Sequence, residues 1–284
     1  MNRYQLTIPA SDLDFAATVT SGMMFRWRRE GDVWVGHDGA ARYRVTAQGD
    51  HYDVETDQPI TAFRSLFRLD EDTAAIAQRI ALAVPELSDV LCHRRIRLLA
   101  PACPVEATVA FLCTANNTLH RIVPMVNALA HPGGAFLSLE EVADLSEERL
   151  RARGFGYRAA TIPRAARAML EQGGEEWLLG LRRQPYEAAR AQLIALPGVG
   201  PKLADCICLF ALHHTESVPV DTHVWQQLQP RLAPEWQGVR FNPRRGQELA
   251  VRLRERCGRD AAWAQQWAFF HGLSHGPARG MVQT

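Results

Sequence analysis

The feature that most constrains the fold is the five-residue segment Leu196-Pro-Gly-Val-Gly200, which lies between two stretches of helical character. One helix is expected over residues 186–195. A second is expected to begin at Pro201, because proline is favoured at the first position of a helix. Glycine adopts backbone angles that other residues avoid, so two glycines two positions apart permit a tight turn. The segment therefore predicts two helices joined by a compact hairpin.

The rest of the chain divides into a β-rich beginning and a helical remainder. Alternating apolar residues predict strands, and an Asp-Gly pair at 38–39 between two of them indicates a β-hairpin. The expected strands are 4–8, 32–36, 42–45 and 51–55, and the expected helices include 60–69, 72–92, 245–256 and 260–273. We therefore expect an α+β fold, with a small antiparallel β-sheet domain at 1–100 and a larger all-helical domain at 101–284 that contains the helix-hairpin-helix.

Composition excludes several classes of protein. The chain has 284 residues, a net charge of +1 and six scattered cysteines. No signal peptide and no apolar run of about 18 residues is visible, so we expect a cytoplasmic protein, nucleoid-associated if prokaryotic, that does not contact a membrane. The scattered cysteines are not typical of a disulfide framework. The basic runs at 26–29 and 93–97 are more typical of solvated faces than of binding sites.

The chain has one lysine, Lys202, among 32 lysine and arginine residues. A bias toward arginine codons explains why lysine is scarce, but it does not explain why a lysine is kept at position 202. Arginine replaces lysine as a charge and cannot replace it as an amine nucleophile. Lys202 is therefore a candidate for amine chemistry.

The glycines of the hairpin suit a phosphate group. Gly198 and Gly200 leave backbone N–H groups without side chains in front of them, and the start of the next helix adds a positive field. Such contacts would hold DNA without reading its sequence. The alternative is an ordinary turn between helices, in which proline and glycine are also common.

Lys202 and Asp221 are the candidate catalytic pair. The helix start around Lys202 is an unfavourable place for a cation, so we expect the field and partial burial to lower the pKa of the amine. An exposed lysine that points into water is the alternative. Asp221 precedes a helix and is therefore also a favoured N-cap, a role that is compatible with catalysis.

Separate blocks of the sequence resemble the DNA glycosylases that contain a helix-hairpin-helix followed by a Gly/Pro-rich loop and an aspartate. Two blocks carry most of the resemblance, namely Leu196-Pro-Gly-Val-Gly-Pro-Lys202-Leu-Ala-Asp-Cys206 and Val218-Pro-Val-Asp221-Thr-His223-Val-Trp225. Others follow in the family's order, namely Ser21-Gly22, Phe25-Arg26-Trp27, Asn116-Asn117, Gly156-Tyr157-Arg158 and Trp263-Ala264-Gln265. The likeness is greatest to the 8-oxoguanine branch, which implies a glycosylase and abasic-site lyase acting in base excision repair.

The resemblance implies a role for each matching residue. Lys202 would attack C1′ of the sugar and form a Schiff base, and Asp221 would stabilise positive charge on the sugar and help to activate the lysine. The base would leave the helical stack. Gly22, Cys206, Gln265 and Phe269 match the residues that bind it. The carbonyl of Gly22 would accept a hydrogen bond from N7–H, which 8-oxoguanine has and guanine lacks.

The resemblance also assigns contacts to the rest of the DNA. The residues that match DNA-binding positions are Asn116, Arg121, Tyr157, Arg158, Gly198, Gly200 and His223. Taken singly, each has an ordinary structural explanation: Phe269 as a core residue, Asn116 at a helix break, Tyr157 and Arg158 at a helix start, and Gln265 facing solvent. The expected partner is double-stranded DNA with 8-oxoguanine opposite cytosine, bound by a monomer.

Two departures from the family pattern stand out. Met23-Met24 follow Gly22 where relatives have polar residues, which leaves strand contacts there open. Gly272 stands where the family often has an acidic partner for His223, so the support of that histidine is open too.

Other functions remain as alternatives. A monofunctional alkylpurine glycosylase would use Asp221 with water and would not need Lys202. A non-catalytic DNA-binding protein would use the hairpin alone. Metal ligation by Cys206, Cys208, His213 and His214 is disfavoured by their spacing. The four clustered cysteines of the iron–sulfur branch are absent, so the expected cofactor set is empty apart from a monovalent cation at the hairpin carbonyls.

Overall fold

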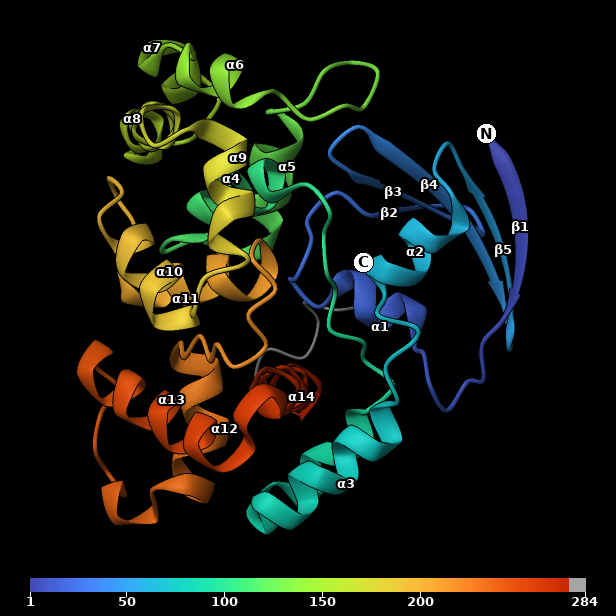
Figure 1. Cartoon of the computed structure of the whole chain (residues 1–284), viewed down its shortest axis with the longest axis vertical. Helices are drawn as coiled ribbons and strands as arrows, with labels where there is room; N and C mark the ends of the chain where they lie inside the picture. The colour runs from blue at the N-terminus through green and yellow to red at the C-terminus, as the bar shows by residue number, and fades with distance from the viewer. Residues whose placement is uncertain (276–284) are drawn as a thin grey trace.

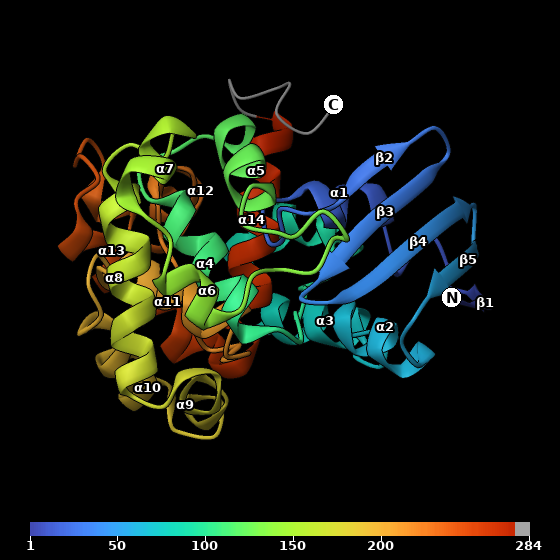
Figure 2. The same cartoon turned by 90° about the horizontal axis from the view of Figure 1, so that it is seen from above.

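The computed structural model describes residues 1–275. An N-terminal sheet stands beside a larger body of helices, and the two are seen side by side in both views (Figures 1 and 2). The strands are β1 Asn2–Thr7, β2 Arg28–Glu30, β3 Val33–Asp38, β4 Ala41–Gln48 and β5 His51–Thr56. The longer helices are α3 Thr73–Ala83, α4 Pro104–Thr114, α8 Arg158–Glu171, α10 Tyr186–Ile194, α11 Pro201–Phe210, α12 Thr222–Leu232, α13 Pro243–Cys257 and α14 Ala261–His275.

The shorter elements connect these. They are α1 Phe15–Thr20, α2 Ile60–Leu66, α5 Leu119–Asn127, α6 Leu139–Ala143, α7 Glu147–Ala152, α9 Gly174–Leu181 and the 3₁₀ helices η1 Pro85–His93, η2 Pro234–Trp236 and η3 Gly258–Asp260. No helix within residues 1–275 combines the length and the apolar character that a membrane span needs.

The five strands form one antiparallel sheet in the order β1-β5-β4-β3-β2. Alternate residues of β4 and β5 are buried, and Val45 lies opposite Val54 on the inner face. This period of two is what the sequence predicts for a half-buried sheet. The expected hairpin is also present, with Gly39 at φ +61° between β3 and β4. The predicted α+β fold class is confirmed.

Aromatic residues fill the space between the sheet and the helices beside it. Trp27 stacks on Tyr43, with ring centroids 6.2 Å apart. Gly36 in β3 makes this possible, because a Cβ atom there would lie 2.2 Å from the Trp27 ring. Phe15 and Phe67 extend the cluster, stacked at 5.2 Å.

One predicted helix is wrong in its extent. Residues 72–92 form α3 and then the separate 3₁₀ helix η1, because Pro85 cannot continue the helical hydrogen bonding. The predicted helix start at Pro201 is confirmed. Another helix, α6, starts after Ser138, which forms a capping box with Glu141. The last two predicted helices are confirmed as α13 and α14.

A buried ionic joint ties the sheet to the helical body. One carboxylate oxygen of Glu106 in α4 accepts from Arg26 at 2.8 Å and from the backbone N–H of Gly39 at 2.6 Å. Asp38, at the end of β3, accepts from the N–H groups of Ala102 and Cys103. The tip of the β3–β4 hairpin is thereby fixed against the start of α4.

Helix α3 packs against α13 and α14, so the segment after the sheet also contacts the C-terminal helices. An exposed ion pair between Arg79 and Asp260 spans the same contact. A domain boundary at residue 100 stays a prediction.

A buried carboxylate fixes the two helices of the hairpin to each other. Asp205 in α11 is 4% exposed. It accepts from the Tyr186 hydroxyl at 2.7 Å and pairs with Arg190 at 2.6 Å, and both partners belong to α10. The hydroxyl of Ser217 donates to the backbone oxygen of Asp205, which adds the segment that leads to α12. These bonds define the angle between the helices that flank 196–200.

The Asp205→Ala variant should lose about 3 kcal/mol of unfolding free energy, because it leaves the buried Tyr186 hydroxyl and the partly buried Arg190 guanidinium without their partner. Urea unfolding followed by circular dichroism measures the change. The exposed pair Glu147–Arg151 provides the control, since Glu147→Ala should cost under about 0.5 kcal/mol. Equal losses in the two variants would contradict a special role for Asp205.

Candidate active site

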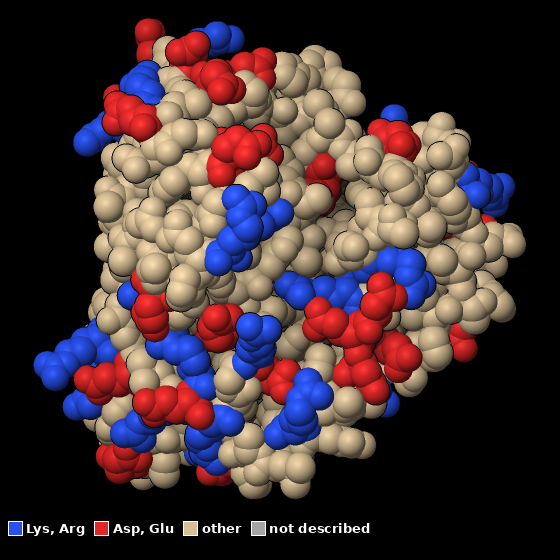
Figure 3. Space-filling model, viewed as in Figure 1, with Lys and Arg blue, Asp and Glu red and all other residues tan. Residues whose placement is uncertain are grey.

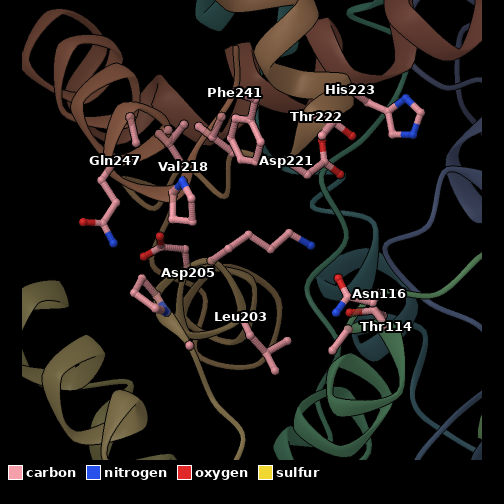
Figure 4. Close-up of a pocket in the computed structure, with 18 of the residues that line it drawn as sticks. Thr114, Asn116, Leu203, Asp205, Val218, Asp221, Thr222, His223, Phe241 and Gln247 are labelled. Carbon is pink, nitrogen blue, oxygen red and sulfur yellow. The ribbon is translucent and has the colours of Figure 1, made fainter. Parts of the chain in front are cut away.

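A cavity of about 490 Å³ lies between the hairpin, the end of α4 and the start of α12. Its walls bring together six residues singled out in the sequence, namely Asn116, Gly198, Gly200, Lys202, Asp221 and His223. Figure 4 shows labelled side chains around this space from several segments, among them Leu203 and Asp205 from α11, Asp221 to His223 at the start of α12, Thr114 and Asn116 at the end of α4, and Gln247 from α13. Segments distant in sequence thus meet in one space.

Lys202 is the second residue of α11, directly after Pro201. Its side chain is open to the solvent of the cavity although protein atoms surround it on most sides. The Cys206 sulfur raises the pKa of the Lys202 amine, burial opposes this rise, and the Asp221 carboxylate adds to it. The expectation of a lowered pKa is therefore wrong for the DNA-free protein, because the partner groups outweigh burial.

Cys206 lies one helical turn after Lys202 and is 3% exposed. Burial raises the pKa of its thiol, so the sulfur is uncharged near neutral pH. The charges of Asp221 and Asp205 are then the influences that still raise the pKa of the Lys202 amine at that pH. Cys206 faces Lys202 as its spacing predicts, but it is not among the residues that line the cavity.

Asp221 caps α12. Its Oδ1 accepts the N–H of Val224 at 2.9 Å, as the N-cap reading of the sequence predicts. Within residues 1–275, no ion pair of 4.0 Å or less joins Asp221 to Lys202. The cap thus fixes the direction of the carboxylate, while the Lys202 amine lies beside the Cys206 sulfur and makes no ion pair with Asp221.

Gln265 is buried in α14 rather than facing solvent. It is 4% exposed, and its Oε1 atom has no hydrogen-bond partner among residues 1–275. An unpaired buried acceptor is costly unless something else binds to it. The neighbouring Gln266 donates to the Ser21 hydroxyl at 3.4 Å, which joins α14 to the segment that contains Gly22. Two predicted base-binding residues are thereby held on adjoining segments.

Phe269 is half-buried on α14, and its ring meets His223 edge-on at 6.4 Å. The space beside Gly272 is filled by Gln227, because a Cβ atom at 272 would lie 3.0 Å from the Gln227 amide nitrogen. Gln227 is one turn after His223 in α12. An amide therefore occupies the place where relatives of the expected branch often have an acid.

Asn116 follows Ala115, the C-cap of α4, and lies in the left-handed region with φ +48°. Arg158 donates to the carbonyls of Ala115 and Asn116, and the Tyr157 hydroxyl donates to Ala115 at 2.9 Å. In the DNA-free protein, Arg158 is therefore buried against this turn, whereas Tyr157 is 52% exposed. Arg121 is exposed on α5.

Met23 and Met24 are core residues, 2% and 8% exposed. Because both side chains are buried in the core, neither can contact a DNA strand in this structure. The Met23 sulfur instead accepts the backbone N–H of Leu99 at 3.5 Å.

Sequence reasoning missed Asp205 and Gln266. Asp205 was visible as a single acid within the otherwise apolar stretch 203–210, which is a pattern typical of a satisfied buried carboxylate. Gln266 had no comparable signal, because its partner Ser21 lies at the other end of the chain.

Figure 3 shows lysine and arginine intermingled with aspartate and glutamate on the side of the molecule in view.

Comparisons with known proteins agree with this arrangement. Residues 109–238 match the family described as the HhH-GPD superfamily base excision DNA repair protein. The N-glycosylase/DNA lyase OGG1 of Arabidopsis thaliana is 31% identical over 95% of this chain and 80% of its own. The N-glycosylase/DNA lyase of Saccharomyces cerevisiae is 28% identical over 78% of this chain and 68% of its own.

Solved structures share the fold. An 8-oxoguanine glycosylase/lyase of Clostridium acetobutylicum, in complex with double-stranded DNA containing cytosine opposite 8-oxoguanine, has a TM-score of 0.80 at 20% identity, with 91% of each chain covered. The 3-methyladenine DNA-glycosylase of Archaeoglobus fulgidus has a TM-score of 0.71 at 16% identity, over 97% of this chain and 100% of its own. Because its helix-hairpin-helix, its cavity and the relatives named above agree, this chain belongs to the OGG1-type N-glycosylase/DNA lyases of the HhH-GPD superfamily.

Proposed function

We propose that this protein is a bifunctional DNA glycosylase and abasic-site lyase that excises 8-oxoguanine from duplex DNA. One observation carries the proposal: the chain's single lysine and the Asp221 carboxylate line the same cavity beside the hairpin glycines. The names of the relatives, N-glycosylase/DNA lyase, support the two activities.

Lys202 is the proposed nucleophile. Its amine attacks C1′, the bond from C1′ to the base breaks, and the departing base takes up a proton. The sugar ring then opens as the C1′–O4′ bond breaks and O4′ takes up a proton, which leaves a Schiff base between C1′ and Lys202. The Schiff base loses a proton from C2′, and the 3′ phosphate leaves by β-elimination. Since its pKa is raised, Lys202 is an ammonium in the DNA-free protein and must lose a proton before it reacts.

Asp221 is proposed to help in two ways. Its second carboxylate oxygen, which the helix cap does not use, is suited to take that proton. Its negative charge also stabilises the positive charge that develops on the sugar as the base departs. The cap makes this anion rigid, so no reorientation is required during the reaction.

Recognition of the base is proposed to use Gln265, Gly22, Phe269 and Cys206. The unpaired Oε1 of Gln265 can accept from the N–H donors on the Watson–Crick edge of a guanine-type base. The Gly22 carbonyl would accept a hydrogen bond from N7–H of 8-oxoguanine. In guanine, N7 is itself an acceptor, so it would repel the carbonyl oxygen. Phe269 and Cys206 would pack on the two faces of the ring.

The remaining contacts follow the same proposal. Gly198, Gly200 and His223 would hold phosphates, and Asn116, Arg121, Tyr157 and Arg158 would fill the vacated space and read the opposing base, proposed to be cytosine. Arg158 would need to leave the carbonyls that it now binds, or act by holding the Asn116 turn in place. The protein is proposed to act as a monomer and to need no cofactor. A monovalent cation is proposed to bind at the hairpin carbonyls.

Borohydride trapping on duplex DNA with 8-oxoguanine opposite cytosine should give a covalent adduct with the wild type. Lys202→Gln should give none, because no other side chain in the sequence carries a primary amine. Gel electrophoresis after reduction reads the result. An adduct that survives in Lys202→Gln would exclude this lysine as the nucleophile.

Two alternatives give other outcomes in the same assay. A monofunctional glycosylase would leave alkali-labile sites without an adduct, and a pure DNA-binding protein would leave neither.

Asp221→Asn should slow single-turnover base release by roughly 100-fold or more, equivalent to about 3 kcal/mol, because the anion that stabilises the sugar is lost. DNA binding should persist. In the wild type the rate should rise with pH as Lys202 deprotonates, since the neutral amine is the reactive form. If Asp221→Asn turns over as fast as the wild type, Asp221 is a helix cap without a role in the reaction.

Gly200→Ser should weaken binding of duplex DNA by roughly tenfold, the equivalent of one or two hydrogen bonds of about 1 kcal/mol each. Serine is a favoured N-cap, so stability should be retained while its hydroxyl takes the helix N–H groups that a phosphate would use. Space around Gly200 is open, and no side chain caps this helix. Fluorescence anisotropy measures the affinity.

Gly198→Ala is the matched comparison. Gly198 has φ +79°, and a Cβ atom there would lie 2.1 Å from the Thr161 methyl group. This variant should lose about 1–3 kcal/mol of stability. If Gly200→Ser binds DNA as tightly as the wild type, the hairpin N–H groups do not hold phosphate.

A further inference from the structure

A cluster of nitrogen and sulfur ligands lies outside the cavity. Cys92 and His93 end the 3₁₀ helix η1, and His271 lies in the last turns of α14. One ligand atom from each of the three residues lies within 4.8 Å of the others. We propose that Cys92, His93 and His271 form a zinc-binding site that joins η1 to α14.

The geometry of the two imidazoles fits a shared metal. Nε2 of His93 and Nδ1 of His271 are 3.1 Å apart. Two nitrogens bound to one tetrahedral zinc ion at about 2.0–2.1 Å stand about 3.3 Å apart. The existing contact between the rings thus holds their nitrogens close to the spacing that the ion requires.

Cys92 supplies the third ligand from the exposed side. Its sulfur now donates to the backbone oxygen of Asp89 at 3.2 Å. Thiolate and imidazole together select zinc over calcium or magnesium, which prefer oxygen ligands. Binding replaces the S–H bond by a Zn–S bond and releases that proton to solvent. Water completes the tetrahedron.

Asp89 lies beside the proposed site, next to the His271 ring. Its Oδ2 lies 3.9 Å from Nε2 of His271, the nitrogen that the metal would not use. Arg231 holds the same carboxylate through an ion pair. Ligating histidines commonly direct their second nitrogen to a carboxylate, which orients the ring. The 3₁₀ period of three also places Asp89 and Cys92 on one side of η1.

The metal would act on the helix that carries Gln265 and Phe269. It would cross-link the end of α14 to η1 and thereby limit fraying of that helix. Its binding can be measured without DNA, so the result does not depend on the proposed excision activity.

The test uses the full chain without a histidine tag, reduced and stripped of metal, titrated with Zn²⁺ against a chromophoric chelator. One equivalent of zinc should bind to the wild type. Cys92→Ser and His271→Gln should each weaken zinc binding by more than roughly 100-fold, which exceeds the loss typical of residues that contact only the ligands and not the metal. Cys257→Ser, which changes another partly exposed cysteine, is the matched control and should bind as the wild type does. The melting temperature of each metal-free variant verifies folding.

Cobalt provides an independent readout. Co²⁺ bound to the wild type and to Cys257→Ser should give a thiolate-to-metal charge-transfer band that Cys92→Ser lacks. Failure of the wild type to bind zinc, or binding that is unchanged in both Cys92→Ser and His271→Gln, would overturn the proposal. A charge-transfer band that persists in Cys92→Ser would do the same.

Discussion

The carboxylate of Asp205 is the interaction on which the geometry of the hairpin depends. It joins α11 to α10 through Tyr186 and Arg190, and its backbone oxygen holds the segment that leads to α12. Lys202 begins α11 and Asp221 begins α12. One buried acid therefore sets the relative positions of the two helix starts that face each other across the cavity.

The groups around the cavity favour the protonated form of the Lys202 amine. Lys202 keeps its proton because neighbouring groups stabilise the ammonium, and Asp221 stays fixed by its own helix. A DNA sugar that enters between them would change this balance by excluding water. Reactivity is thus expected to develop on binding rather than to exist in the free protein.

Local patterns in the sequence were enough to predict four of the five strands of the described sheet, the β-hairpin and several helix starts, because each depends on periodicity, glycine or a capping side chain. The short strand β2 was not predicted, since all three of its residues are exposed and it has no alternating pattern. The break at Pro85 was missed because an apolar period continued through it. The Lys202 pKa was predicted in the wrong direction, since its value depends on Cys206 and Asp221 as placed by tertiary structure. The contact of Gln266 with Ser21, and that of His93 with His271, join residues that no local pattern relates.

The single lysine has a practical consequence. Apart from the α-amino group of the chain, every primary amine available to an acylating or reductively alkylating reagent is the one in the cavity. Isotope-enriched methyl groups attached there would give one side-chain resonance, free of overlap from surface lysines. The sequence thus provides a spectroscopic reporter at its own reaction centre without any engineered label.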